Sequence, residues 1–320
     1  MDEFILIKKY FSRLAKKNKG SLDLNDDVFF DNSKKLVVSV DTYVQGIHFI
    51  NFKKPDLVIK KIIRSSISDL VCKGVKPKYY FISGSGNDES FSKLNLHKIS
   101  KSLKQEQNKY NIFLCGGDTV YSNKLSFSIT SIGFSKKIIK RNNAKLNDDI
   151  YVTGNIGDSY MGLKILKKQI KLKKKISEKY FIDKYFQPDL KLTLTNKLLN
   201  FANTSIDISD GLISDLEKLI GEQKLTYKLN LVDIPISSNL KKLLLSKKLK
   251  KISYISQGDD YQILFTASIS KSRIIDNIAK SLGIKISKIG KICSINHKSQ
   301  IIDQKGNKIT LKNKGYNHNF

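Results

Sequence analysis

Aspartates recur in this chain within short motifs of small residues, and the motifs are widely separated in sequence. They stand where apolar runs end or where the chain turns: Asn25-Asp26-Asp27, Ser39-Val40-Asp41, Ser68-Asp69-Leu70, Gly116-Gly117-Asp118-Thr119 and Asp207-Ile208-Ser209-Asp210-Gly211. In a basic protein, such carboxylates indicate that negative charge is needed at one point. Magnesium takes oxygen ligands of this kind and is commonly held beside nucleotide phosphates. The fold is therefore expected to gather remote segments around a magnesium and phosphate site.

Lysine dominates the rest of the composition. The net charge is +29, and all but four of the 58 basic residues are lysine. Charge alone is a weak signal for nucleic-acid binding, and base readout favours arginine. We therefore expect no nucleic-acid role, and we interpret lysine runs such as 171–175 as solvated helix faces.

Composition also bears on the compartment. No apolar run approaches the roughly 18 residues that a membrane span needs, so no membrane association is expected. The acidic start, Met1-Asp2-Glu3-Phe4, lacks the basic-then-apolar order of a signal peptide. Cys72, Cys115 and Cys293 form no CxxC pair, which argues against a zinc site or a disulfide framework. A reducing, cytoplasmic location is predicted.

Hydrophobic patterning predicts alternating helices and strands in the first half. Apolar residues Phe4, Ile7, Phe11 and Leu14 share one face of an expected N-terminal amphipathic helix. The further expected elements are a hairpin formed by 28–30 and 36–40, a helix from Pro55 to a cap at Gly74, a strand at 79–83, a helix at 91–110, and strands at 112–115 and 125–134 flanking a Gly-Gly-Asp turn.

A polar, basic stretch at 136–147 lacks apolar periodicity and marks an expected domain boundary. The predicted domains are 1–140, for ATP and magnesium binding and dimerisation, and 141–320. The second domain is expected to contain a strand at 150–154, helices at 160–168 and 190–201, a helix after Gly211, and strands at 261–265 and 284–289. The predicted fold class is α/β or α+β with two domains.

Familiar nucleotide-binding motifs are absent. There is no P-loop sequence, and Gly84-Ser85-Gly86 is too short for a Rossmann fingerprint. No nucleophile elbow and no kinase catalytic loop occur. Each acidic motif alone has an ordinary alternative as a turn residue or helix cap. The combination is what carries the information.

That combination resembles the thiamine-monophosphate kinase family, in the superfamily of aminoimidazole ribonucleotide synthetase and selenophosphate synthetase. The resemblance runs almost end to end. Besides the aspartate motifs, it rests on Val44-Gln45-Gly46-Ile47-His48-Phe49, Tyr151-Val152-Thr153-Gly154, Gly157-Asp158-Ser159, Gly258-Asp259-Asp260-Tyr261 and Lys314-Gly315-Tyr316. The His48 segment and the final Lys-Gly-Tyr favour the thiamine kinase within the superfamily. The resemblance implies a homodimer whose N-terminal mixed sheets form a shared barrel.

The resemblance also implies a set of site residues. The implied catalytic residues are Asp27, Asp41, Asp69 and Asp118. The implied magnesium ligands are Asp27, Ser39, the Val40 carbonyl, Asp41, Asp69, Asp118, Asp207 and Asp210. Gly117, Asp118, Arg141 and Ser209 would contact ATP, and His48, Asp259 and Asn313 would lie on the acceptor side. Arg141 could alternatively be an ordinary surface cation. His48 could alternatively be a core histidine whose hydrogen bonds are satisfied within the protein.

Four positions depart from the family pattern. Asn25 replaces a glycine, and Val40 replaces a threonine while keeping its main-chain oxygen. Asp259 occupies a position where the family has a glutamate, and Asn313 occupies one where the family often has a tryptophan. These departures bear more on recognition of thiamine than on ATP and magnesium.

The implied reaction is magnesium-dependent, in-line transfer of the γ-phosphoryl group of ATP to thiamine monophosphate, giving thiamine diphosphate. The acceptor phosphate oxygen is already charged, so no strong base is required. One alternative is another enzyme of the superfamily with a different acceptor. Such relatives usually carry a glycine-rich or cysteine- or lysine-bearing N-terminal segment, whereas 18–25 holds one glycine and no cysteine. A basic nucleic-acid-binding module is the alternative from a different class.

Overall fold

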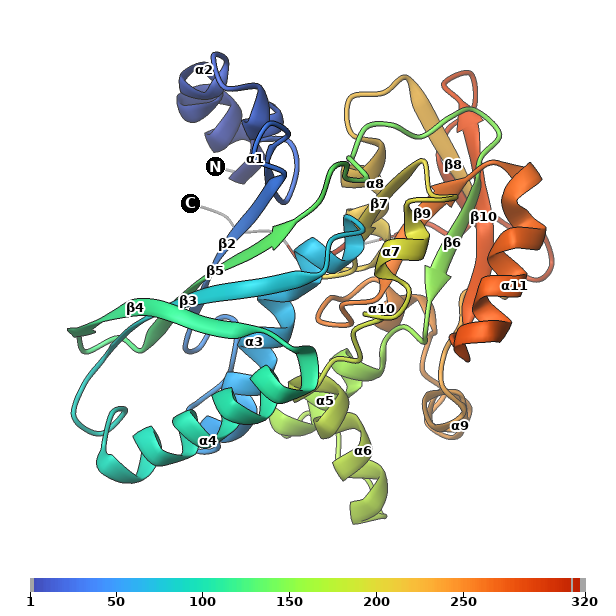
Figure 1. Cartoon of the computed structure of the whole chain (residues 1–320). Helices are drawn as coiled ribbons and strands as arrows, with labels where there is room; N and C mark the ends of the chain where they lie inside the picture. Colours follow the sequence, from blue (N-terminus) through green and yellow to red (C-terminus); the bar gives the residue numbers. More distant parts are fainter. Residues whose placement is uncertain (1–2, 312, 317–320) are drawn as a thin grey trace.

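Two β-sheets, each covered by helices, make up the computed structural model, which describes residues 3–311 and 313–316 (Figure 1). The five-stranded sheet has the order β1-β2-β5-β3-β4, and the six-stranded sheet has the order β11-β8-β10-β6-β9-β7. The mixed α/β class expected from the sequence is confirmed. Among the described residues, no helix has the length and apolar character needed to cross a membrane.

The first sheet is mostly antiparallel, with one parallel pair, β3 and β4, connected through helix α4. One face of this sheet, including strand β4, is not covered by any helix of the described structure. The other face packs against α3. The elements of this half are α1 (Glu3–Leu6), η1 (Ile7–Phe11), α2 (Ser12–Ala15), η2 (Lys19–Leu24), β1 (Phe29–Asp31), β2 (Leu36–Val44), α3 (Pro55–Cys72), β3 (Pro77–Gly86), α4 (Lys93–Tyr110), β4 (Phe113–Tyr121) and β5 (Ser126–Phe134).

Helix α3 forms where the sequence predicts it. Pro55 occupies the first turn, where its missing N–H costs no hydrogen bond, and Asp56 favours the positive end of the helix dipole. Gly74 follows the helix with a φ of +79°, a left-handed conformation that suits glycine. Val58, Ile62 and their apolar neighbours are fully buried against the sheet. The helix is therefore a rigid support for the polar residues on its remaining face.

The Gly-Gly-Asp turn expected from the sequence is wrong. Gly116, Gly117 and Asp118 lie inside β4, which pairs with β3 from Tyr79↔Phe113 to Gly86↔Tyr121. A β-carbon on Gly117 would lie 1.7 Å from the carbonyl oxygen of Ile82. The glycines therefore permit a close approach between two strands, which is another common use of glycine besides turns.

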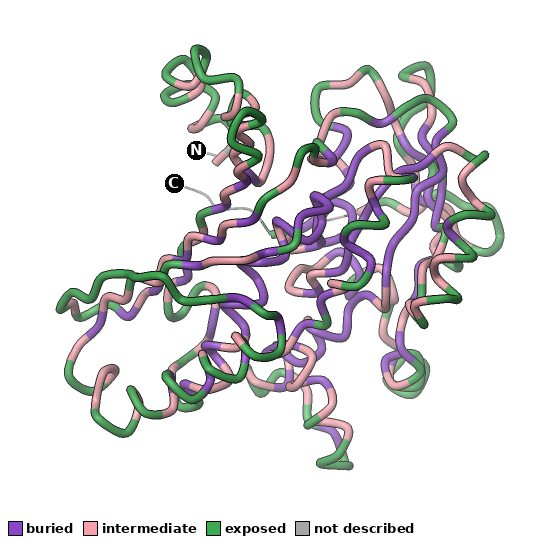
Figure 2. Tube along the Cα trace, in the orientation of Figure 1, coloured by how far each residue is buried: buried purple, intermediate pink, exposed green. Residues whose placement is uncertain are grey.

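The N-terminal segment is helical but does not pack as an amphipathic helix. A π-helical turn, η1, interrupts it between α1 and α2. Ile7 is half-buried, whereas Phe11 and Leu14 are exposed, Leu14 to 80%. The side chain of Phe4 lies outside the described part of the structure. The helical character was thus predicted correctly, but Phe11 and Leu14 remain exposed, and Figure 2 draws this segment in the exposed and intermediate colours.

The second sheet belongs to the C-terminal half, and residues 135–148 lead to it without a helix or strand. Its elements are β6 (Asp149–Thr153), α5 (Asp158–Leu166), α6 (Lys175–Phe186), α7 (Thr195–Leu198), β7 (Thr204–Asp207), α8 (Leu212–Ile220), β8 (Leu225–Asn230), α9 (Ser238–Ser246), α10 (Ile252–Ile255), β9 (Ile263–Ala267), η3 (Ile269–Lys271), α11 (Ser272–Leu282), β10 (Ile286–Ser294) and β11 (Gln300–Ile302).

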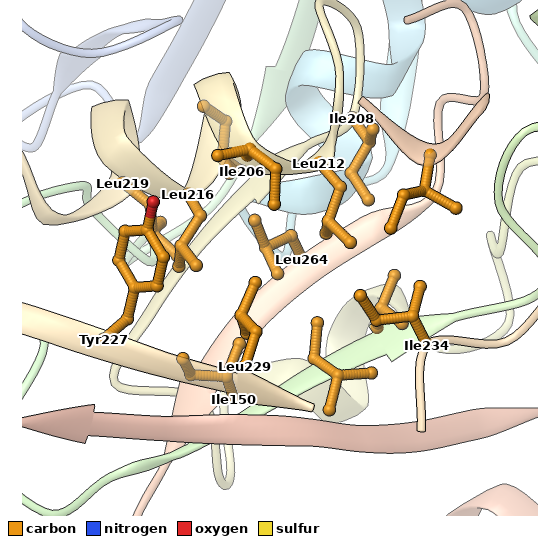
Figure 3. Packing of buried hydrophobic residues seen from close by; sticks show 14 of the residues in the cluster. Ile150, Ile206, Ile208, Leu212, Leu216, Leu219, Tyr227, Leu229, Ile234 and Leu264 are labelled. Atoms are coloured by element: carbon orange, nitrogen blue, oxygen red, sulfur yellow. The ribbon is translucent and has the colours of Figure 1, made fainter. Parts of the chain in front are cut away.

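Helix α8 and the second sheet share one apolar core. Leu212, Leu216 and Leu219 extend from α8 toward Ile150 of β6 and Leu264 of β9 (Figure 3). The helical spacing of these leucines is the pattern from which the sequence predicted the helix. Their burial fixes the start of α8, and with it the Asp207–Gly211 segment that precedes the helix.

Two other expectations for this half differ from the structure. The helix expected at 190–201 is reduced to the single turn α7, and α6 was not predicted at all. The lysine run 171–175 leads into α6, with only Lys175 inside the helix, rather than forming a solvated helix face. Lysines before and within α6 obscure its apolar period, although Phe181, Tyr185 and Phe186 are buried.

Candidate active site

Three carboxylates from remote segments meet where the two sheets approach each other across α3. Asp41 lies on β2, Asp69 on α3, and Asp207 is the last residue of β7. Alternation along β2 places Ser39, Asp41 and Tyr43 on the face that packs against α3. The structure thus brings together three of the aspartates that the sequence singled out.

The electrostatics of these three carboxylates favour a cation. Burial raises the pKa of Asp41 to about 6 and that of Asp207 to about 6. Burial, together with the charges of Asp41 and Asp207, raises the pKa of Asp69 well above its usual range. The Oδ2 atom of Asp41 is buried without a hydrogen-bond partner, and Ser68 donates a hydrogen bond to Oδ2 of Asp207. Like charges in a low-dielectric site are costly unless they are protonated or neutralised.

The chemistry of this set fits magnesium, although the side chains are not pre-arranged around one ion. Within residues 3–311 and 313–316, no three His, Cys, Asp or Glu side chains form a group ready to hold a metal. Hard oxygen donors with an unpartnered buried atom are nevertheless the ligands that Mg2+ takes, and it fills its remaining positions with water. Asp41, Asp69 and Asp207 are therefore the residues that would hold it.

A second acidic group, Asp26 and Asp27, is already paired with cations. Lys73 Nζ lies 2.8 Å from Asp26 Oδ1 and 2.9 Å from Asp27 Oδ2. Arg141 donates from its backbone N–H to Asp26 Oδ2 at 2.9 Å and from Nε to Asp27 Oδ2 at 3.0 Å. Its Nη2 also contacts Asp27 Oδ1. The structure therefore places Arg141 on an aspartate rather than leaving it as a free surface cation.

The third acidic group surrounds the start of α8. Asp210 pairs with Lys218, whose Nζ also lies 3.1 Å from Asp215 Oδ1. Asp215 accepts hydrogen bonds at 3.0 Å from the backbone N–H groups of Asp210 and Gly211. The backbone N–H of Tyr316 donates to the Asp210 carbonyl at 3.0 Å. The Lys-Gly-Tyr segment near the C-terminus is therefore bound beside the Asp207–Gly211 motif.

The expected acceptor-side residues lie at the other end of α3. Lys61 Nζ is 2.5 Å from Asp259 Oδ1 and 3.8 Å from the centre of the Tyr185 ring. Tyr185 in turn donates its hydroxyl to the carbonyl of His48 at 3.2 Å, which connects His48 to the same group. The Nδ1 atom of His48 accepts the backbone N–H of Val44 at 3.0 Å.

The remaining predicted residues occupy different surroundings. The Val40 side chain points away from α3, so only its carbonyl is a candidate ligand. The Ser209 carbonyl accepts the backbone N–H of Asp259 at 2.8 Å, which connects the motifs expected to contact the nucleotide and the acceptor. Asn313 is exposed and accepts the backbone N–H of Gly315.

Asp118 is not part of the carboxylate group in this chain. It pairs in register with Ser83 on β3, and Ser83 pairs with Ser128 on β5, which pairs with Thr42 on β2. Three strand spacings of about 4.8 Å separate Asp118 from β2 by roughly 14 Å. Two ligands of one Mg2+ ion lie within about 4 Å of each other. Asp118 and Asp41 of one chain therefore cannot share an ion in this arrangement.

Comparison with known proteins identifies the family. The family described as AIR synthase related protein, N-terminal domain, matches residues 24–135. A thiamine-monophosphate kinase from Buchnera aphidicola (subspecies Acyrthosiphon pisum) is 34% identical over 322 residues, covering 99% of this chain and 98% of the relative. The chain belongs to the thiamine-monophosphate kinase family.

Solved structures agree in fold with this member of the thiamine-monophosphate kinase family. The thiamine monophosphate kinase from Aquifex aeolicus is 25% identical, has a TM-score of 0.77 and covers 93% of this chain and 96% of its own. A structure of AaThiL complexed with AMPPCP and TMP has a TM-score of 0.84 and covers 99% of this chain and 97% of its own. Because the two chains are only 24% identical, this similarity is evidence for the shared fold.

Two buried lysines in this thiamine-monophosphate kinase family member escaped the sequence reasoning. Lys61, Ser65 and Asp69 follow one another at intervals of four residues along α3, and Lys73 continues that spacing just past the C-terminal end of the helix. The row of residues from Lys61 to Lys73 spans about 18 Å along the helix axis, with Asp69 inside it and one lysine at each end. Their spacing of eight and four residues from Asp69 was a weak signal, because the chain is so rich in lysine.

Magnesium binding by this family member is expected to weaken as the pH falls through about 6, because Asp41 and Asp207 both have a pKa of about 6 when folded. The same carboxyls ionise near pH 4 in an unfolded chain. Without metal, the free energy of unfolding that they contribute is therefore present at low pH and is lost as the pH rises through about 6. Magnesium favours the charged forms and reverses that loss.

Thermal unfolding with EDTA and with MgCl2, at about pH 5.5 and about pH 7.5, measures this linkage. The rise in Tm caused by magnesium is expected to be larger at the higher pH. Comparing the two conditions at each pH cancels titrations elsewhere in the chain. An equal rise at both pH values would contradict the assignment of these carboxyls to the metal.

Proposed function

We propose that this protein transfers the γ-phosphoryl group of ATP to the phosphate of thiamine monophosphate. An acceptor phosphate oxygen attacks the γ-phosphorus, the bond to the β–γ bridging oxygen breaks, and ADP leaves, giving thiamine diphosphate. The observation that carries the proposal is the convergence of the half-buried Asp41 and Asp69 and the buried Asp207 from three elements in a chain of this family. ATP as co-substrate and TMP as acceptor are in keeping with the related structure complexed with AMPPCP and TMP.

The obstacle to this reaction is repulsion between two phosphate groups that must meet in line. Bound magnesium supplies positive charge that neutralises and orients both groups. We assign Asp41, Asp69 and Asp207 to holding it, with Asp27, Ser39 and the Val40 carbonyl as further oxygens. Ser68 keeps Asp207 oriented through its hydrogen bond.

The nucleotide end is proposed to lie near Asp27 and Asp210. Arg141 pairs with Asp27 there. We propose that it can exchange this carboxylate for a nucleotide phosphate, because the planar guanidinium group binds both in the same way. Ser209 and Gly117 complete the proposed ATP contacts, and Asp210 would hold a further ion on the phosphates.

The acceptor end is proposed to lie near Asp259, His48 and Asn313. Lys61 and the hydroxyl of Tyr261, 3.3 Å from Asp259 Oδ1, fix the Asp259 carboxylate. Asp259 is only partly covered, with 26% of its side chain exposed, so it remains accessible to a ligand. This arrangement supports a role for Asp259 in acceptor recognition.

We further propose that the active protein is a homodimer. All nine residues of β4 are exposed, including Phe113, Leu114, Val120 and Tyr121. Val40 and Phe81 add apolar area on the uncovered face of the same sheet. A contiguous apolar surface of this kind is typical of an interface. We propose that a second copy on this face supplies its Asp118 to the site that the first copy's own Asp118 does not reach.

The compartment follows from cysteine chemistry. Cys72, Cys115 and Cys293 are all free, and Cys115 is exposed. An exposed thiol persists in a reducing environment. We propose that the reaction takes place in the cytoplasm.

Turnover of ATP with thiamine monophosphate tests the proposed reaction. We expect ADP formation that depends on both thiamine monophosphate and magnesium, with thiamine diphosphate as the product seen by chromatography. Unphosphorylated thiamine serves as the control acceptor and is expected to give no turnover. A DNA-binding titration against salt concentration tests the rival class. ATP turnover with another acceptor and none with thiamine monophosphate would favour a different enzyme of the superfamily.

A further inference from the structure

Lys73 has the surroundings of a bound cation rather than those of an ordinary lysine. Its side chain has no exposed surface. Its Nζ lies 2.8 Å from Asp26 Oδ1 and 2.9 Å from Asp27 Oδ2, and it donates to the carbonyl of Ser205 at 2.9 Å. The three N–H bonds of an ammonium group are thus matched by three oxygens from two remote segments.

Charge balance distinguishes the two acidic groups of the site. Asp26 and Asp27 face Lys73 and Arg141, so two anions meet two cations. Asp41, Asp69 and Asp207 have no such partner within hydrogen-bond distance in the described structure; Ser68 donates to Asp207. Asp41, Asp69 and Asp207 therefore need an added cation, whereas Lys73 already supplies one to Asp26 and Asp27.

We propose that Lys73 is a built-in cation of the site, which takes the place of a divalent ion at the Asp26–Asp27 pair. It neutralises Asp26 and occupies Oδ2 of Asp27, so Asp27 has only Oδ1 to offer a metal. That atom is held by Arg141 and becomes free when Arg141 moves to the nucleotide. Lys73 is a positioning residue, because it acts through the two aspartates and not on a substrate.

The positions of the two cations explain why only one of them exchanges. Lys73 immediately follows α3, whose buried apolar face fixes it, and its ammonium is enclosed on all sides. Arg141 belongs to the irregular segment between the sheets, and 10% of its side chain is exposed. Nucleotide binding therefore releases one oxygen of Asp27 and leaves the other on Lys73.

This inference rests on the proposed function in one respect, namely that the aspartates hold metal beside a nucleotide. Its test counts metal ions instead of measuring turnover. Mn2+ is added to the protein with AMPPCP, and free Mn2+ is measured by electron paramagnetic resonance. We expect Lys73→Met to bind about one more Mn2+ ion per chain than the wild type, because the vacated aspartates take a divalent ion.

The matched control is Lys61→Met. Lys61, on α3, is as buried as Lys73 and also pairs with an aspartate, but its partner Asp259 lies at the proposed acceptor end. This variant is expected to keep the wild-type Mn2+ count, whereas Lys73→Arg is expected to restore that count by restoring the charge. An unchanged count in Lys73→Met would overturn the role of Lys73.

Stability gives a second measurement. In EDTA, Lys73→Met is expected to have a lower Tm than the wild type, and MgCl2 is expected to raise its Tm by more than it raises that of the wild type. If Lys73→Met does not fold, Lys73→Gln keeps a donor toward Ser205, and its recovery as folded protein only with magnesium supports the role. Failure of both variants to fold even with magnesium would overturn it. Absence of any Mn2+ binding by the wild type would instead contradict the proposed function.

Discussion

Asp69→Asn is expected to lower kcat by roughly 10³-fold or more, about 4 kcal/mol of transition-state stabilisation, while leaving the protein folded. Asp69 lies near both Asp41 and Asp207, and its pKa is raised well above its usual range by burial and by those two charges. An amide removes a metal oxygen with negative charge at the point where two phosphates must be brought together. Steady-state kinetics with ATP and thiamine monophosphate measures the loss.

The same substitution is expected to raise the Tm in EDTA, because it removes one of three mutually repelling carboxylates. A lower kcat combined with a higher metal-free Tm separates a lost ligand from a damaged fold. Asp56→Asn is the matched control, since Asp56 lies on the same helix in its first turn, away from the cluster. Full kinase activity in Asp69→Asn would refute the assignment.

Mixing two inactive variants is expected to restore activity if the partner's strand β4 completes the site. Asp118→Asn and Asp69→Asn are each expected to be inactive as homodimers. In a heterodimer of the two variants, one site combines Asp69 from the Asp118→Asn chain with Asp118 from the Asp69→Asn chain. The other site has neither aspartate. After subunit exchange at equal concentrations, roughly a quarter of wild-type activity is expected, because half of the dimers carry one intact site.

The physical reason is the distance between Asp118 and Asp41 within a chain, three strands apart across the sheet. If each site used its own chain's Asp118, neither variant could supply the aspartate that the other lacks, and the mixture would remain inactive. Light scattering of the wild type at micromolar concentration provides the independent check, and a monomer would contradict the dimer. Val120→Lys, on the exposed β4, is expected to give monomers with little activity.

Much of the fold could be predicted from local patterns. The β1–β2 hairpin, α3 with its Gly74 cap, and α8 after Gly211 all follow from strong periodicity with clear end signals. Helix α6 was missed because lysines interrupt its apolar period. The Gly116-Gly117 pair was misassigned to a turn because a close approach between strands leaves the same glycine signal as a tight turn.

The site was predicted in part. Asp41, Asp69 and Asp207 meet as the aspartate motifs indicated, and Asp27 lies beside Arg141. Lys61 and Lys73 were not predicted, because a lysine in a lysine-rich chain carries no individual signal. Only their burial distinguishes them from the solvated majority.

The sequence by itself determined which chemical groups were available, the elements that carry most of them, and the family to which the chain belongs. The tertiary structure decided which charges meet. Lys73 and Arg141 neutralise Asp26 and Asp27, Lys61 pairs with Asp259, and Asp118 lies apart on an open strand. Pairing of this kind depends on distances of a few ångströms between segments remote in sequence. Periodicity and motif spacing describe only neighbours along the chain, so those distances are set when the two sheets pack around α3.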